Sequence, residues 1–89
     1  MQPDHLAKVL GLEPNGGKIL ALLAVHPNQI VGKAILMKIS AHPAATISRV
    51  RTRLRSLRAP GRLMVRRGRG YLITQPLSDW INEQMDRPQ

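Results

Sequence analysis

The residues of this chain best suited to molecular recognition are arginines, and they are concentrated in one stretch. Nine arginines lie between Arg49 and Arg69. The guanidinium group is planar, stays charged and carries its N–H donors in a fork, so it can bind a phosphate group or the O6 and N7 atoms of guanine. Arginines at this density favour the binding of a partner with many negative charges over a reaction at a single centre.

Carboxylates are missing from the same part of the chain. The five acidic residues lie near the two ends, and none occurs between Pro14 and Ser78, where twelve of the 14 Lys and Arg residues are found. The formal net charge is +9. A surface that served solubility alone would mix both signs, whereas a block of one sign attracts a polyanion. Nucleic acid is the polyanion that we expect, and anionic lipid on a generic basic surface is the alternative.

Patterns for catalysis and metal binding are not found in the sequence. The chain has no cysteine, which excludes disulfides, thiolate zinc sites and thiol catalysis. Its three histidines are far apart, and two of them precede proline, which favours roles at helix ends over metal ligation. The five acids near the ends do not form a carboxylate pair or a Ser-His-Asp set. We therefore expect neither an enzyme, nor a cofactor, nor a metal ion.

The length of 89 residues predicts one domain, because two hydrophobic cores would not fit in so short a chain. Hydrophobic residues make up 43% and aromatic residues only 2%, so the core must be built from aliphatic side chains. The longest apolar run, residues 19–25, is far shorter than the roughly 20 residues that cross a bilayer. With no basic and apolar leader either, we expect a cytoplasmic protein that does not enter membranes and is associated with the nucleoid.

A helix over residues 44–58 is predicted to carry the first group of arginines. Apolar residues recur there at steps of three, four and three, which forms one narrow stripe: Ile47, Val50, Leu54 and Leu57. At about 100° per residue, the opposite face carries short side chains and arginine: Ala45, Ser48, Arg49, Thr52, Arg55 and Ser56. Such a face suits a helix that fits closely against another molecule.

The second group of arginines belongs to a predicted β-hairpin. Residues 62–67 and 71–74 are two extended runs around Gly68-Arg69-Gly70, and glycine accepts the positive φ of short hairpin turns. Because side chains alternate between the faces of a strand, Arg66 and Arg67 are expected on opposite faces. At most one of that pair should share a face with Arg69, and we expect it to be Arg67.

Shorter elements are predicted before the arginine-rich helix. One helix covers residues 4–10 and stops at Gly11, and a second extends from an N-cap at Asn15 to about Val25. Residues 29–31 are expected to be extended. A third short helix is predicted over residues 33–40, with three apolar residues inward: Ile35, Leu36 and Ile39.

A closing helix is predicted over residues 78–86. Ser78 is its expected N-cap, and Gln75-Pro76 is expected to break the preceding strand. An apolar face runs along this helix: Leu77, Trp80, Ile81 and Met85. That face either packs on the core or makes a homodimer contact, and the apolar face of the first helix can share in either: Leu6, Val9 and Leu10.

Three helices followed by a β-hairpin is the order of elements in a winged helix-turn-helix, an α+β fold. We therefore predict a single winged-helix domain over residues 1–89, with its core at about residues 15–74 and a short extra helix at each end. In this fold the third helix enters the major groove of DNA, and the hairpin, or wing, lies on the adjacent backbone or minor groove.

Two segments resemble a known family. Residues 47–54 (ISRVRTRL) and 65–71 (VRRGRGY) resemble the DNA-binding effector domains of bacterial response regulators of the OmpR/PhoB type. The recognition helix of that family has the pattern I-x-R-L-R-x-K-L, and its wing has T-V-R-G-x-G-Y. Residues 19–24 and 26–31 are also similar to its first helix and the following turn, so the likeness covers about residues 15–74.

The resemblance implies that the chain binds duplex DNA through the helix at residues 44–58 and the wing at residues 62–74. Carried over by position, Arg49 contacts bases and Arg51 contacts phosphate, while Arg67 and Arg69 serve the wing. The full set of residues expected to contact DNA is Thr46, Ser48, Arg49, Arg51, Thr52, Arg53, Arg55, Arg66, Arg67 and Arg69.

The sequence also departs from that family. These residues contain no receiver domain, and the first fifteen residues have no room for the family's N-terminal four-stranded sheet. The loop that contacts RNA polymerase in the family corresponds to only about residues 41–45. We therefore expect neither control by phosphorylation nor direct recruitment of polymerase.

The expected function is that of a small stand-alone transcriptional regulator with sequence-specific DNA binding. One alternative is an architectural, nucleoid-associated protein that coats DNA through phosphate contacts. Another is a module that binds protein or RNA on the same fold. A regulator is expected to bind its site about 10³–10⁷ times more tightly than random DNA, which separates it from the architectural protein.

Overall fold

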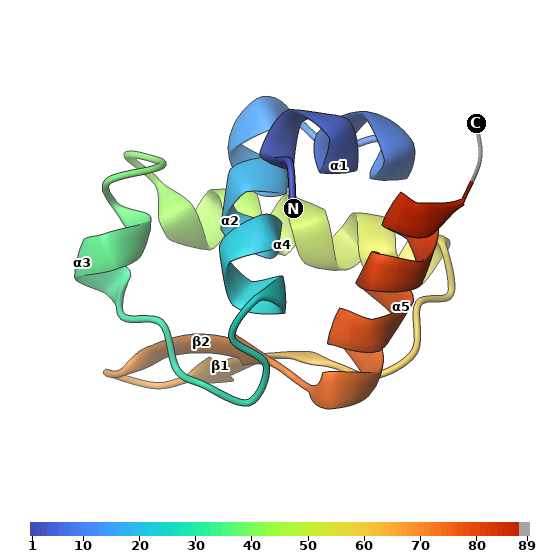
Figure 1. The fold of residues 1–89 in the computed structure, drawn as a ribbon. Helices are drawn as coiled ribbons and strands as arrows, with labels where there is room; N and C mark the ends of the chain where they lie inside the picture. Colours follow the sequence, from blue (N-terminus) through green and yellow to red (C-terminus); the bar gives the residue numbers. More distant parts are fainter. Residues whose placement is uncertain (88–89) are drawn as a thin grey trace.

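Five helices and one β-hairpin follow one another along residues 1–87, the part of the chain that the computed structural model describes (Figure 1). The elements are α1 (Pro3–Leu10), α2 (Pro14–Ala24), α3 (Lys33–Leu36), α4 (Pro43–Ser56), β1 (Leu63–Arg66), β2 (Gly70–Ile73) and α5 (Gln75–Asp86). This is a small α+β fold, and its order of elements is compatible with a winged helix.

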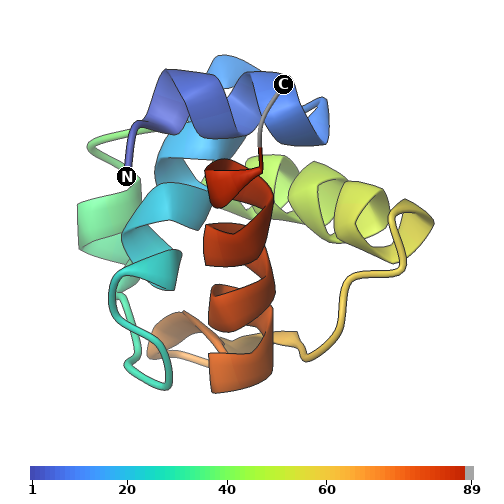
Figure 2. The same cartoon turned by 45° about the vertical axis from the view of Figure 1, so that its right-hand side comes forward.

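The first two helices meet at a tight corner. α1 stops at Gly11, as predicted, and Gly11 has a φ of 70°. α2 begins at Pro14 with Glu13 at the N-cap position, so the expected N-cap at Asn15 is wrong. Proline is favourable in the first turn of a helix, because its fixed φ is helical and the N–H that it lacks would have no partner there. α1 then packs on both α2 and α5 (Figure 2).

α3 is shorter than predicted. The helix covers four residues and continues only as turns to residue 39, not as a helix to residue 40. Leu36 is fully buried and Ile39 is partly buried, but Ile35 is 50% exposed, which corrects its expected inward position. A single helical turn can bury only one narrow side, and neighbouring residues project about 100° apart.

α4 packs on the core through the predicted apolar stripe. Ile47, Val50 and Leu54 are buried, and Leu57 is partly buried just beyond the end of the helix. The helix begins at a proline, as α2 does, and ends two residues before the predicted end. Its C-terminal turn leads into Arg58, which has a positive φ of 56°.

The hairpin pairs β1 with β2, with Leu63 opposite Ile73. The expected extended segment at residues 29–31 makes a single bridge to the free edge of β2. The Val31 N–H donates to the Tyr71 carbonyl (2.8 Å), and the Tyr71 N–H donates to the Val31 carbonyl (3.1 Å). Gly70 permits this approach, because a Cβ at its position would collide with the Val31 carbonyl oxygen. The α2–α3 connection is thereby bound to the hairpin.

α5 starts earlier than predicted. Thr74 is at its N-cap position. Pro76, which was expected to break the preceding strand, lies in the first turn of this helix. Ser78 was expected to be the N-cap, but it is a buried residue inside the helix. Its hydroxyl donates a 2.6 Å hydrogen bond to the Ala24 carbonyl, so it joins α5 to the end of α2.

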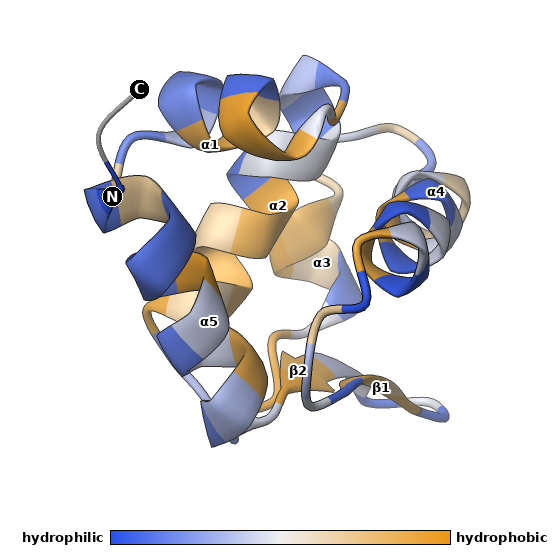
Figure 3. Cartoon of the chain, turned by 90° about the vertical axis from the view of Figure 1, so that its right-hand side faces the viewer, coloured by the Kyte–Doolittle hydropathy of each residue, from blue (hydrophilic) through white to orange (hydrophobic). Residues whose placement is uncertain are grey.

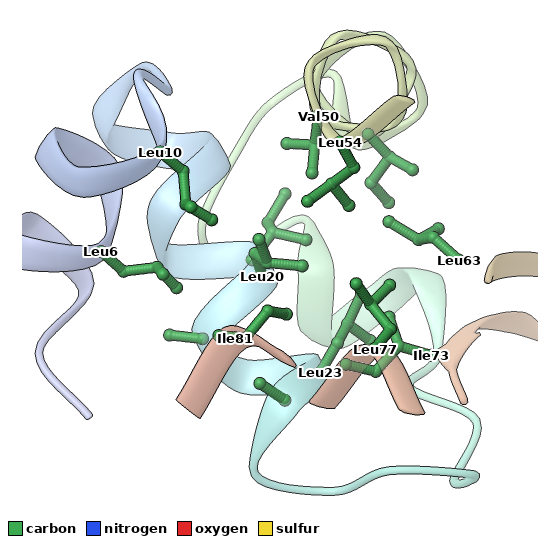
Figure 4. Packing of buried hydrophobic residues seen from close by; sticks show 14 of the residues in the cluster. Leu6, Leu10, Leu20, Leu23, Val50, Leu54, Leu63, Ile73, Leu77 and Ile81 are labelled. Atoms are coloured by element: carbon green, nitrogen blue, oxygen red, sulfur yellow. The ribbon is translucent and has the colours of Figure 1, made fainter. Parts of the chain in front are cut away.

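The core is one cluster of aliphatic side chains around α2 (Figure 4). Leu20 and Leu23 of α2 lie at its centre, between α1, α4, the hairpin and α5. Leu77 and Ile81 are 2% and 0% exposed, and Trp80 and Met85 pack partly buried against the cluster. The apolar face of α5 is thus a core face, because the chain itself covers Leu77 and Ile81. The homodimer contact considered as its alternative role stays a prediction, and on this face only the partly buried Trp80 and Met85 remain accessible for it.

Candidate nucleic-acid interface

α4 and the tip of the hairpin project on one side of the molecule, and α5 lies on the opposite side (Figure 3). The outer faces of α4 and of the hairpin tip are mostly hydrophilic (Figure 3), and the large apolar residues of α4 turn inward, whereas Val65 of β1 is 51% exposed. We call the exposed residues of α4 and the hairpin that were expected to bind DNA the arginine surface. It consists of Ser48, Arg49, Arg51, Thr52, Arg53, Arg55, Arg66, Arg67 and Arg69.

Short polar side chains form the outermost ridge of α4. Ser48 and Thr52 are exposed, lie one turn apart and face away from the buried stripe around Val50. The Thr52 hydroxyl donates to the Ser48 carbonyl (3.1 Å), which holds it along the helix. A ridge of short side chains lets a flat or concave partner come close to the helix backbone.

Thr46 is not part of this surface. It is 2% exposed, its hydroxyl donates to the His42 carbonyl (3.2 Å), and its oxygen lies 3.0 Å from the Ser40 hydroxyl. The Ser40 hydroxyl in turn accepts the His42 N–H (3.2 Å). Thr46 therefore closes the N-terminal end of α4 from inside, and the expectation that it contacts DNA is corrected.

One flank of α4 is anchored to the corner between α1 and α2. The Nε of Arg49 donates to the Glu13 carboxylate at 2.7 Å, and the Nε of Arg53 donates to the Leu10 carbonyl at 2.7 Å. The Arg53 guanidinium also lies against Gly11. Both bonds use the inner nitrogen of the arginine, so the two Nη groups are not needed to hold either side chain in place.

The other flank of α4 borders a groove of about 500 Å³ between the helix and the hairpin. Arg51 and Arg55 line it from α4, and Arg62 lines it from the connecting loop. Its apolar lining includes Leu54 and Leu63. The groove therefore combines an aliphatic lining with three cationic side chains and places the hairpin beside α4.

The hairpin tip carries three exposed arginines. Arg66 ends β1, and the turn is closed by a hydrogen bond from the Arg69 N–H to the Arg66 carbonyl (2.9 Å). Gly68, at φ of 76°, provides the left-handed residue of this turn. Arg67 was predicted to end the first strand, but it lies in the turn. Strand alternation therefore does not determine the face on which it lies.

Positive charge dominates the arginine surface because almost no carboxylate reaches it. Within residues 1–87, ion pairs join Arg49 to Glu13 at 2.7 Å and Arg87 to Glu83 at 3.9 Å. Among those residues, none of the other arginines of the surface lies within 4.0 Å of a carboxylate. The Arg49 and Glu13 side chains are 61% and 42% exposed, so solvent weakens their attraction.

Sequence reasoning missed the role of Glu13. In the structure Glu13 is the N-cap residue of α2, and its carboxylate forms an ion pair with Arg49 of α4. The one clue in the sequence is that Glu13 is the last acid before the long acid-free segment. Its partner lies 36 positions away, so only the packing of α1 and α2 against α4 brings them together.

Residues 1–87 contain no cluster of three His, Asp or Glu side chains that could hold a metal ion. Within the same range, no helix has the length and apolar character needed to span a membrane. Comparisons of this chain with protein-family models, with curated proteins and with solved structures found no match. The function is therefore inferred from the arginine surface.

Proposed function

We propose that this protein binds double-stranded DNA through the arginine surface. α4 enters the major groove, and the hairpin lies on the adjacent backbone or minor groove. The observation that carries the proposal is the composition of α4, a ridge of short polar side chains with exposed arginines along both flanks. A helix is about 10–12 Å wide with its side chains, which matches a major groove about 12 Å wide.

The groove beside α4 supports contacts with the DNA backbone. Arg51, Arg55 and Arg62 line it, and phosphate is the anion that repeats along the edge of a DNA groove. Guanidinium groups bind phosphate oxygens with two parallel hydrogen bonds. These contacts would hold the helix in its register without selecting a base sequence.

The fold in this proposal is a winged helix similar to that of OmpR/PhoB-type effector domains, and the protein is a stand-alone transcriptional regulator. Four observations support it. α2, α3 and α4 precede the hairpin, the Val31–Tyr71 bridge joins the α2–α3 connection to that hairpin, and Gly70 permits the close approach. Arg49 and Arg51 lie on different flanks of α4, as expected of residues with different roles.

An architectural DNA-binding protein is the second candidate. It is favoured by the short side chains at the outermost ridge of α4, where the Thr52 hydroxyl is already bonded to the Ser48 carbonyl. Such a ridge makes few contacts to base edges, and arginines that bind only phosphate do not distinguish sequences. The ratio of the affinities for a selected site and for random DNA separates the two candidates.

Fluorescence anisotropy with labelled oligonucleotides tests the proposal. We expect a random 20-base-pair DNA duplex to bind more tightly than an RNA duplex of the same sequence, because α4 fits only the wide major groove of B-form DNA. Selection of bound sites from random duplexes then tests the regulator. Equal or tighter binding of RNA, or no binding of DNA at physiological salt, would contradict the proposal.

The matched control for this assay is Arg87→Ala. Arg87 directly follows α5, the helix that lies opposite α4 (Figure 3), and it carries the same charge as each arginine of the surface. Its replacement should change DNA affinity less than replacement of Arg51 or Arg55 does. Equal losses would show that net charge, and not the arginine surface, determines the binding.

A further inference from the structure

We propose that Glu13 is a positioning residue that orients Arg49 toward a guanine base. The inference rests on the proposed binding of duplex DNA and adds to it a determinant of sequence preference outside α4. Glu13 lies at the corner between α1 and α2, and its carboxylate holds the Nε of Arg49 at 2.7 Å. A charge-assisted bond of this length restricts the rotation of the guanidinium plane.

The nitrogen that Glu13 occupies decides what remains for DNA. A guanidinium has one N–H on Nε and two on each Nη. With Nε bound to Glu13, the edge formed by the two Nη groups is still available. That edge can donate two parallel hydrogen bonds to the O6 and N7 atoms of one guanine, which is the most frequent specific contact in the major groove.

Glu13 is well suited to this role because its backbone is fixed while its side chain is not used to cap α2. The Leu12 N–H donates to the Ala7 carbonyl (2.8 Å), and the Gly17 N–H donates to the Glu13 carbonyl (3.0 Å). These bonds hold the corner on both sides of Glu13. A side chain at an N-cap position often accepts a backbone N–H of its own helix, but that of Glu13 does not.

Arg53 shows that the anchoring is a local arrangement and not a single chance contact. It follows Arg49 by one turn, and its Nε is bound to the Leu10 carbonyl of the same corner, also at 2.7 Å. The corner therefore holds two arginines of α4 by the same atom. Arg49 differs in that its acceptor is a side chain, which can be replaced without disturbing the backbone.

Removal of the Glu13 carboxylate should have two opposite effects. One negative charge disappears beside the arginine surface, so the affinity for random duplex should rise about twofold to fivefold. Arg49 also loses its orientation, so the preference for guanine at one position should fall about fivefold or more, within the range that a bidentate contact provides. A residue that only competes with DNA for Arg49 would produce the first effect without the second.

The test compares the full chain with two Glu13 variants, a control variant, Arg49→Ala and the Glu13→Ala/Arg49→Ala double variant on three duplexes. The duplexes are the site selected by the wild type, the same site with G·C replaced by A·T at the position where Arg49→Ala loses its preference, and a random sequence. Glu13→Ala removes the acceptor, whereas Glu13→Gln removes the charge but keeps an oxygen for Nε. Glu83→Ala removes the same charge from the exposed face of α5 and is the matched control.

We expect Glu13→Ala to lose the guanine preference at the position that depends on Arg49, and Glu13→Gln to retain most of it. Glu83→Ala should leave the preference unchanged. Adding Arg49→Ala to Glu13→Ala should cause no further loss of preference, because both changes remove the same contact. The exposed ion pair contributes little to stability, so both Glu13 variants should fold.

Other outcomes overturn the inference and are distinguishable from failure of the proposed function. If Glu13→Ala tightens binding to all three duplexes by the same factor, Glu13 only competes with DNA for Arg49. If Glu13→Gln loses as much preference as Glu13→Ala, the charge matters and the orientation does not. A wild type that binds duplex DNA without any base preference refutes the inference but leaves DNA binding intact, whereas absence of duplex binding refutes both.

Discussion

The two flanks of α4 carry arginines at equivalent spacing but have different neighbours. Arg49 and Arg53 are held through Nε by Glu13 and by the Leu10 carbonyl. Arg51 and Arg55 border the open groove beside the hairpin, and no carboxylate among the described residues lies within 4.0 Å of them. An anchored arginine has lost side-chain entropy before it binds and points in one direction, whereas a free arginine adapts to the partner. The difference suggests base contacts from the first flank and phosphate contacts from the second.

Replacement of the three arginines that line the groove should have the largest effect. We expect Arg51→Ala, Arg55→Ala and Arg62→Ala together to weaken binding to every duplex by about 3 kcal/mol, roughly 100-fold, because each is proposed to contact a phosphate. Anisotropy titrations on selected and random duplexes measure this loss. The matched control replaces Lys8, Lys18 and Arg87, which are exposed on α1, α2 and beyond α5. A similar loss in the control would remove the distinction between the open flank and the rest of the surface.

A smaller and more selective effect is expected on the anchored flank. Arg49→Ala should cost roughly 1–3 kcal/mol on the selected site and change the affinity for random DNA little, because the contact proposed for Arg49 reads one base. Competition assays with single-position variants of the site measure the relaxed preference. If Arg49→Ala and Arg51→Ala cause the same sequence-independent loss, the two flanks have one role, and the architectural protein becomes the better description.

The hairpin tip is a third region for this comparison. Within residues 1–87, no hydrogen bond to another protein group anchors an arginine side chain of this tip. Arg69→Ala should weaken binding by about 1 kcal/mol, and most strongly where the flanking DNA is rich in A·T, because narrow minor grooves concentrate negative potential. Its melting temperature should stay nearly unchanged, since the tip is exposed. Footprints of the two proteins on A·T-rich and G·C-rich flanks provide the measurement. Identical flanking protection would show that the hairpin does not touch DNA.

The smallest expected effect concerns stability without DNA. Arg53→Ala should lower the free energy of unfolding by about 1 kcal/mol, because it removes a partly buried hydrogen bond to the Leu10 carbonyl. Arg55→Ala should change it by less than about 0.5 kcal/mol, since that side chain is exposed on the open flank. Thermal melts followed by circular dichroism compare them. Equal melting temperatures would mean that the anchored flank contributes nothing to the fold.

Periodicity in the sequence predicted the elements that carry the arginine surface. The buried stripe of α4 and the hairpin around Gly68 were both found, because local spacing determines each of them. The starts of helices were less well predicted. Pro76 was expected to act as a break, yet Pro14, Pro43 and Pro76 each lie in the first turn of a helix. Proline disfavours the helical conformation in the residue before it, but it can itself begin a helix.

Contacts between distant residues account for what the sequence could not predict about the site. Thr46 has the polarity of a surface residue. It is buried because the segment with Ser40 and His42 packs against the start of α4 and bonds its hydroxyl. Glu13 and Arg49 are 36 positions apart, so no local pattern pairs them. Sequence spacing thus distinguished the inner from the outer side of α4, but the two flanks became distinct only when their neighbours were known.

The salt dependence of binding to a random DNA duplex tests the central claim most directly. If the arginine surface and Arg62 of the neighbouring groove together neutralise about six to eight phosphates, a plot of log K against log salt concentration should have a slope of about −5 to −7. The variant without Arg51, Arg55 and Arg62 should have a slope smaller in magnitude by about 3, one unit for each lost phosphate contact. A slope near zero for the wild type, or the same slope for both proteins, would contradict binding of duplex DNA through this surface.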